Sequence, residues 1–132
     1  MNKNGILSVV IVVSAVILIG LWALRTGRER AGARQFDCAA APDAPTALTA
    51  EPIANTSARM TWQAPGGVEM PTTYVLETGS ASGKSDVATF IIPGNTTTSE
   101  RAGVPGTFFL RVYARNACGT SSPSNEVSIV LQ

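Results

Sequence analysis

The feature that most limits the possible folds is a two-residue alternation near the C-terminal end of the chain. Between Gly106 and Asn116 the sequence reads GTFFLRVYARN. One side of this segment is apolar, and the other mixes aromatic residues with arginine. The apolar side consists of Phe108, Leu110, Val112 and Ala114, and the other side of Phe109, Arg111, Tyr113 and Arg115. This period is typical of a half-buried β-strand, so we expect the apolar side to face a protein core.

A series of short strands is expected around this segment. A second alternating stretch, Val127–Leu131, follows a polar loop, and turn sequences rich in Pro, Gly and Asn separate the earlier strands. Those earlier strands are expected at residues 46–50, 57–63, 72–78, 87–92 and 96–100. Seven short strands at this spacing predict an all-β, immunoglobulin-like sandwich. The core residues expected are Trp62, Tyr74, Leu76, Phe108, Leu110, Val112 and Ile129.

Composition excludes several classes of function. The chain has no histidine, which removes Ser-His-Asp and Cys-His catalysis and the commonest metal ligand. Two cysteines alone cannot supply the four ligands of a structural zinc site. Residues 38–132 carry five Lys/Arg against seven Asp/Glu, and this mildly acidic balance does not suit nucleic-acid binding. We therefore expect no enzyme, no cofactor or metal, no nucleic-acid partner and no small-molecule substrate.

The N-terminal region has a different character. Residues 6–24 form an uncharged run interrupted only by Ser8, Ser14 and Gly20. A helix of this length spans about 28 Å, close to the ~30 Å hydrocarbon core of a bilayer. We expect a single-pass transmembrane helix at 6–24, a short flank at 1–5 and a linker at 25–41 that is first basic and then rich in Ala and Pro. The alternative is a cleaved signal peptide, whose apolar region is normally about 7–15 residues long.

The charges beside the apolar run bear on its orientation. Lys3 lies before the run, whereas four arginines, offset by Glu29, lie after it. Taken alone, this bias favours a cytoplasmic location for the C-terminal side.

The segment 42–132 resembles the fibronectin type III domain, here preceded by an N-terminal transmembrane anchor. The resemblance begins with Pro45 and Leu48, Trp62 followed by Pro65, and the sequence Tyr-Val-Leu-Glu at 74–77. It continues with Arg-Val-x-Ala-x-Asn at 111–116, Gly119, and Ser-Pro-Ser-Asn-Glu at 122–126. The turn at 79–86 is similar to that of bacterial members. The resemblance implies a seven-stranded sandwich and an extracytoplasmic location.

Two departures from the family pattern concern individual strands. Phe108 stands where the family usually has a corner tyrosine, so a hydroxyl contribution of about 1 kcal/mol is expected to be missing. The strand expected at 96–100 lacks the usual apolar residues.

The resemblance also places the two cysteines at one end of the sandwich. Cys38 precedes the first strand, and Cys118 lies in the loop between the last two strands. A disulfide between them is therefore expected, and it needs an oxidising compartment. This expectation opposes the arginine count and favours a membrane protein whose C-terminal domain lies in the periplasm or at the cell surface.

The candidate interaction face is the outward side of the strand described first. It comprises Phe109, Arg111, Tyr113 and Arg115, with Glu77 expected on the neighbouring strand. Aromatic residues and arginine are enriched at interface hot spots. We therefore expect a membrane-anchored, non-catalytic module that docks a protein or a glycan. The alternatives are a purely structural stalk or assembly component, and a secreted accessory module released by signal cleavage.

Overall fold

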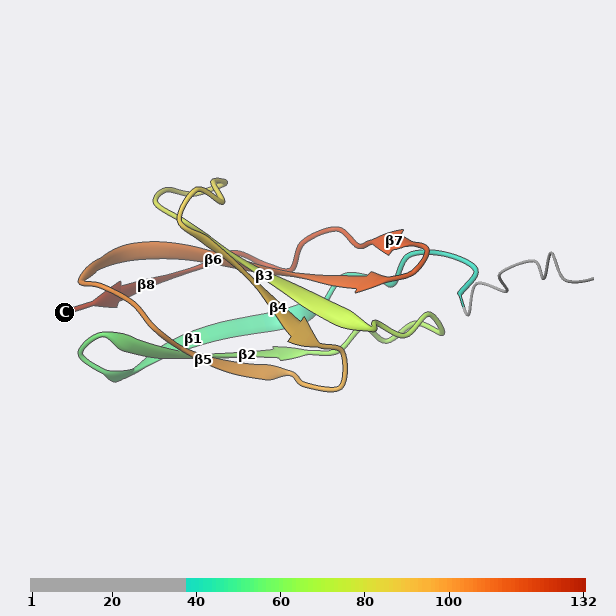
Figure 1. Ribbon diagram of the computed structural model, residues 1–132, viewed down its shortest axis with the longest axis horizontal. Coiled ribbons are helices and arrows are strands. Elements are labelled where there is room, and N and C mark those ends of the chain that lie inside the picture. Colours follow the sequence, from blue (N-terminus) through green and yellow to red (C-terminus); the bar gives the residue numbers. More distant parts are fainter. Residues whose placement is uncertain (1–37) are drawn as a thin grey trace, which may run out of the picture. The chain divides into compact units, whose positions relative to one another are not determined.

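Two antiparallel sheets packed face to face form the C-terminal part of the protein (Figure 1). The computed structural model describes residues 38–132, so the helix expected at 6–24, its flank at 1–5 and the linker residues before Cys38 lie outside the described residues. Within 38–132, no helix is long and apolar enough to cross a membrane. The strands are β1 (Thr46–Ala54), β2 (Ser57–Gln63), β3 (Thr73–Gly79), β4 (Ala88–Pro93), β5 (Thr98–Ala102), β6 (Gly106–Asn116), β7 (Gly119–Thr120) and β8 (Val127–Leu131).

The strand order divides the chain between the two sheets. One sheet has the order β1-β2-β5, and the other the order β4-β3-β6, with β7 and β8 both pairing with β6. All the pairings are antiparallel. Strands β4 and β5 are edges of the two sheets, and they lie on the same side of the sandwich because Arg101 of β5 lies over the Phe90 ring of β4.

The core forms where the apolar sides of the two sheets meet. Trp62 of β2 and Tyr74 of β3 are buried and make an edge-to-face contact across the core, with ring centroids 5.3 Å apart. Leu76, Leu110, Val112 and Ile129 are buried as well, whereas Phe108 is half-buried and packs against this cluster.

The structure corrects the expected strand count from seven to eight. The additional strand, β7, has only two residues, which pair with Arg115 and Asn116 at the end of β6. Two residues are too few to show an alternation, so the sequence pattern predicts a loop at this position.

The polar strand expected at 96–100 is present as β5, shifted by two residues. Its backbone pairs with β2 in a regular register in which Ser99 lies opposite the buried Met60. Ladder hydrogen bonds come from the backbone and do not need apolar side chains, so β2 can hold this strand in place. The consequence is that the inward side of β5 carries Ser99 and Arg101 where a sandwich core would normally have apolar residues.

The first strand is longer and less regular than expected. Its register with β2 shifts between Thr46 and Thr49, and Ala47 within this shift has a φ of 51°. Just beyond, the Asn125 side chain forms two hydrogen bonds of 2.9 Å with the backbone N–H and carbonyl of Leu48. Asn125 therefore ties β1 to the segment before β8 and so joins the two sheets.

Candidate interaction face and disulfide end

The candidate interaction face is the outward side of the β4-β3-β6 sheet. The register places Glu77 opposite Arg111 and Val75 opposite Tyr113. On the other side of Val75 lies Ile91 of β4, which is 59% exposed. An apolar row across three strands therefore lies next to a row of charged residues.

Arg111 is the centre of the charged row. Its guanidinium lies 3.3 Å from a carboxylate oxygen of Glu77 and 3.9 Å from one of Glu126. One of its N–H groups also donates to the Gly83 carbonyl at 3.4 Å. The charge of Arg111 is thus compensated within the domain, which leaves it less available to a partner.

Glu126 links the charged row to the loop between β3 and β4. Its carboxylate accepts hydrogen bonds from the Ser82 hydroxyl at 2.6 Å and from the Gly83 N–H at 2.8 Å. The hydroxyl of Ser82, the backbone N–H of Gly83 and the nearby Arg111 lower the pKa of Glu126 below its ordinary value. The alternation along the strands places Glu77 on the candidate face but does not indicate Glu126, because Ser82 and Glu126 are 44 residues apart.

The other expected residues of this face differ in exposure. Arg115 is exposed, and among the described residues it forms no ion pair. Phe109 and Tyr113 are half-buried, and burial is the main cause that raises the pKa of the Tyr113 phenol. The structure brings all four β6 residues to one side of the sheet, but only Arg115 among the charged residues there lacks a compensating carboxylate in the described part of the chain.

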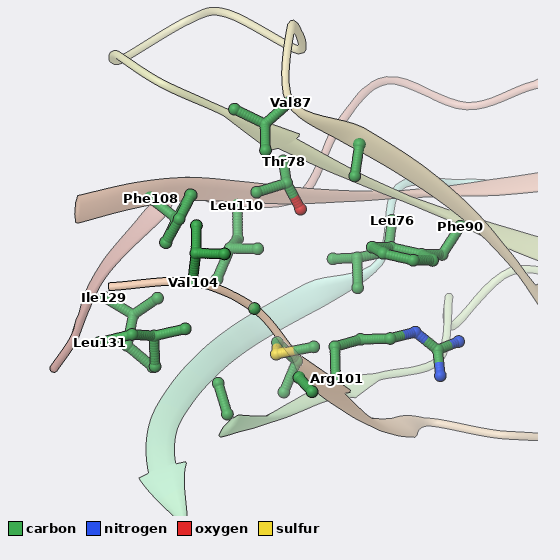
Figure 2. A pocket seen from close by; sticks show the side chains of 15 residues that line it. Leu76, Thr78, Val87, Phe90, Arg101, Val104, Phe108, Leu110, Ile129 and Leu131 are labelled. Carbon is green, nitrogen blue, oxygen red and sulfur yellow. The ribbon is translucent and has the colours of Figure 1, made fainter. Parts of the chain in front are cut away.

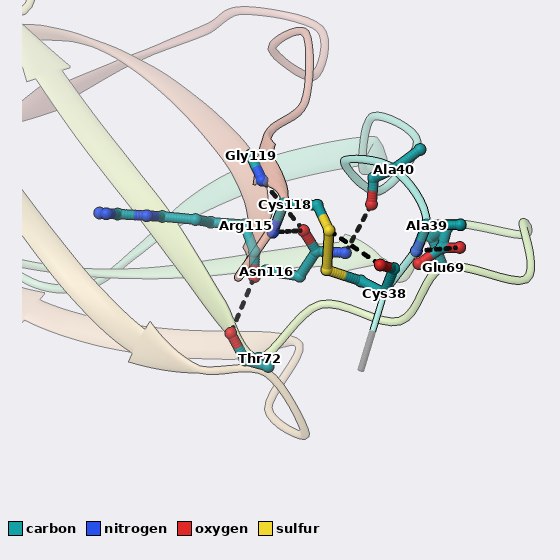
Figure 3. Close-up of a disulfide and its surroundings, with 9 residues drawn as sticks. All are labelled: Cys38, Ala39, Ala40, Glu69, Thr72, Arg115, Asn116, Cys118 and Gly119. Atoms are coloured by element: carbon teal, nitrogen blue, oxygen red, sulfur yellow. Dashed lines mark hydrogen bonds between the residues drawn. A yellow bond between two sulfur atoms is a disulfide. The ribbon is translucent and has the colours of Figure 1, made fainter. Parts of the chain in front are cut away.

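The disulfide lies at one end of the sandwich (Figure 3). Cys38 and Cys118 are joined, with their Cα atoms 6.1 Å apart, as expected. Asn116 reinforces the junction: its amide donates to the Ala40 carbonyl at 2.8 Å, and its side-chain oxygen accepts from the N–H groups of Cys118 and Gly119. The Ala39 N–H donates to the Glu69 carboxylate at 3.0 Å. The start of the described chain is therefore attached to both end loops.

The segment between β7 and β8 follows β6 without being a strand. The hydroxyls of Ser121 and Ser124 accept hydrogen bonds from the N–H groups of Ala114 and Val112, at 2.9 and 3.0 Å. The N–H groups of the same two serines donate to the carbonyls of Ala114 and Val112, each at 2.8 Å. The serine hydroxyls thus take the place of the carbonyl oxygens that a paired strand would offer to β6. Because the segment is not a regular strand, it accommodates a proline at position 123, which has no N–H to donate.

Comparisons with known proteins support the fold at the level of structure only. No family model matches the chain, and no curated protein does. The CNTN1 FN1–FN3 domains of chicken match with a TM-score of 0.61 at 15% identity, over 70% of this chain and 33% of that chain. An FN3 domain of human collagen XX matches with a TM-score of 0.56 at 17% identity, over 70% of this chain and 98% of that chain. The fold is fibronectin type III-like.

A redesigned β-sandwich protein matches as well, with a TM-score of 0.56 at 22% identity over 67% of this chain and 94% of that chain. At these identities the likeness describes the architecture and not the activity. The match spans about one third of the chicken FN1–FN3 chain, so the rest of that chain has no counterpart in the match.

Proposed function

We propose that the protein is a non-catalytic docking module, exported from a bacterial cell and held at the membrane by the apolar segment 6–24. The observation that carries the docking role is the outward face of β3, β4 and β6. There the apolar row formed by exposed Ile91 and half-buried Val75 and Tyr113 lies on the same face as Arg115, which forms no ion pair with the described residues. Domains of this fold commonly serve in interactions, which supports the same assignment.

The chemistry of this face favours a protein partner. A tyrosine next to branched aliphatic side chains supplies apolar contact area, and arginine supplies a directed charge, which are the properties of interface hot spots. Since Arg111 is already paired with two carboxylates, Tyr113 and Arg115 are the residues expected to contribute most. The partner would present an apolar patch beside an acidic side chain.

The export of the domain is supported by the Cys38–Cys118 disulfide, because such bonds persist in oxidising compartments. The uncharged run at 6–24 has the length of a membrane span, which supports anchoring. Together these features favour a domain in the periplasm or at the cell surface.

The test of docking is recovery of a crosslinked partner from the cell envelope with the full-length protein. Tyr113→Ala and Arg115→Ala are each expected to reduce recovery at least several-fold, whereas Thr61→Ala, an exposed change on the opposite sheet, leaves it unchanged. The variants should keep the melting temperature of the wild type. Equal recovery by all of these proteins contradicts docking on this face, and recovery of a glycan in place of a protein contradicts the proposed partner class.

A purely structural stalk is the second candidate function, and the disulfide end favours it. The bond and the contacts of Asn116 and Glu69 hold the start of the domain at one end of the sandwich, while Gln132 lies at the other (Figure 1). If the domain is a stalk, changes at Tyr113 and Arg115 should leave the recovery of the crosslinked partner unchanged, whereas shortening the domain should change it.

A further inference from the structure

The interior of the sandwich is incompletely filled near the connection between β5 and β6. The inward positions of β5 are Ser99, which is small, and Arg101, whose polar side chain extends to the Phe90 ring of β4 and does not fill the core. Gly103 then contributes no side chain, and Val104 is 65% exposed. Polar or missing side chains at three of these positions, and an apolar side chain that lies largely outside the core at the fourth, leave space that apolar residues would otherwise occupy.

The space left is a pocket of about 250 Å³ between the two sheets (Figure 2). Side chains from both sheets line it, and nearly all of them are apolar, among them Met60, Leu76, Phe90, Phe108, Leu110 and Leu131. Exposed lining residues, Val87 and Val104, show that it opens to solvent on the side of the edge strands β4 and β5. A pocket lined in this way suits an apolar group, because its wall offers bound water few hydrogen-bond partners.

Arg101 supplies the one charged group of the pocket wall. Its stem lies along the pocket, and its guanidinium carbon is 4.8 Å from the centroid of the Phe90 ring (Figure 2). Within residues 38–132 it has no carboxylate partner: one N–H donates to the Glu100 carbonyl, and the buried Nε has no acceptor. A buried N–H without an acceptor is costly, so an added acceptor at this position is favoured.

We propose that this pocket binds an aliphatic monocarboxylate, with its chain between the two sheets and its carboxylate paired with Arg101. The pocket volume sets the chain length. An apolar cavity of about 150 Å³ holds the six carbons of benzene, so the volume here suits roughly ten carbons. Arginine pairs with carboxylates through two parallel N–H groups, which distinguishes the acid from an alcohol of equal length.

The proposed ligand site is independent of the docking face. The pocket lies inside the sandwich, and the row formed by Ile91, Val75 and Tyr113 lies on its outer surface. Failure of either proposal therefore leaves the other standing. The acid is a bound ligand and not a substrate, since no catalytic group among the described residues faces the pocket.

The test is photolabelling of the full-length protein in phosphatidylcholine nanodiscs with a diazirine derivative of decanoate. Label is expected in the peptide that contains Val104 and Phe108, and excess decanoate should abolish it. Decanol should compete at least ten-fold more weakly, because it lacks the charge that pairs with Arg101. This comparison uses only the wild-type protein, so it does not depend on the folding of any variant.

Two variants address the wall of the pocket directly. Ala88→Leu enlarges the side chain at a lining position, and Arg101→Gln removes the charge and leaves a shorter polar side chain. Both are expected to reduce labelling at least ten-fold, whereas Arg115→Gln, which removes an arginine on the outer face, should not. Near-UV circular dichroism of the buried Trp62 verifies the fold.

Three outcomes would overturn the proposal. Label confined to residues 6–24 would show that the probe reaches only the apolar segment. Equal competition by decanoate and decanol would show that Arg101 does not contribute to binding. Unchanged labelling in the correctly folded Ala88→Leu variant would place the probe outside the pocket.

Discussion

Individual polar side chains hold the loops of this domain in place. Asn116 binds the chain next to the disulfide, Asn125 joins β1 to the segment before β8, and Glu126 holds the loop between β3 and β4. Each forms its contacts with backbone groups distant in the sequence, which would otherwise lack a partner in the folded state. These residues belong to the motifs that indicated the family resemblance, so their presence in those motifs has a structural reason.

The charge of Glu126 predicts a specific dependence of stability on pH. Its folded-state pKa lies below the ordinary value of 4.5, so its contribution is present above that value and is lost as the pH falls through the folded pKa. Between about pH 6 and pH 3, the wild type should lose more free energy of unfolding than Glu126→Gln. Urea denaturation at the two pH values measures the difference, and Glu51→Gln controls for the loss of one exposed carboxylate. Parallel losses in wild type and Glu126→Gln would contradict the role of this residue.

At the scale of elements, β6 organises the sheet to which it belongs. It pairs with β3 on one side and with β7 and β8 on the other, and the serines at 121 and 124 continue the pairing between these two. The buried N–H of Val112 depends on the Ser124 hydroxyl. The integrity of this edge therefore depends on a side chain and not only on a ladder of backbone groups.

Removal of that hydroxyl should have a measurable cost. Ser124→Ala leaves the Val112 N–H without this acceptor in a buried position, and we expect a loss of about 1–3 kcal/mol in the free energy of unfolding. Ser122→Ala, an exposed change two residues away, should be close to neutral. Chemical denaturation of both variants is the measurement. Equal stability of the two would show that water or another group satisfies the Val112 N–H.

Much of the element structure could be predicted from the sequence, for physical reasons that differ between strands. The alternation in residues 57–63 and 106–116 fixed both the strands and their buried sides, because each has one face in the core and one in solvent. β5 is predicted as a strand at 96–100 that lacks the usual apolar residues, and the structure places it at 98–102 because its position depends on pairing with β2. The pocket was not predicted at all, because it results from what several strands together fail to fill. Glu126 was missed for a related reason, as its partners come from another loop.

At the scale of the whole molecule, the disulfide is the constraint that joins the most distant parts of the described chain. Cys38 and Cys118 are 80 residues apart in sequence. Closing a loop of this length removes entropy from the unfolded chain equivalent to about 4–5 kcal/mol at 25 °C in the chain-entropy model. The bond is therefore expected to contribute a large part of the stability of a domain whose core also contains an open pocket.

Two measurements on the full-length protein check this constraint. Reduction, or replacement of both cysteines by serine, should lower the free energy of unfolding by about 2–4 kcal/mol. In intact cells, both thiols should resist alkylation until a reductant is added, with no disulfide-linked dimer. Immediate labelling of both would contradict the proposed export and would favour the orientation indicated by the arginines near the apolar run. The Cys38→Ser and Cys118→Ser single variants control for thiol accessibility.

The position of the disulfide also determines how the domain would carry a mechanical load. Cys38 precedes β1, so tension applied at that residue passes through the sulfur atoms to Cys118, beside the end of β6. The disulfide therefore carries the tension past β1, which would otherwise be the first strand to separate from β2 under load. Force from the far end arrives through β8, which also pairs with β6. The β6–β8 ladder then carries most of the force, and the sheet that contains β1, β2 and β5 lies outside the direct path between the two ends.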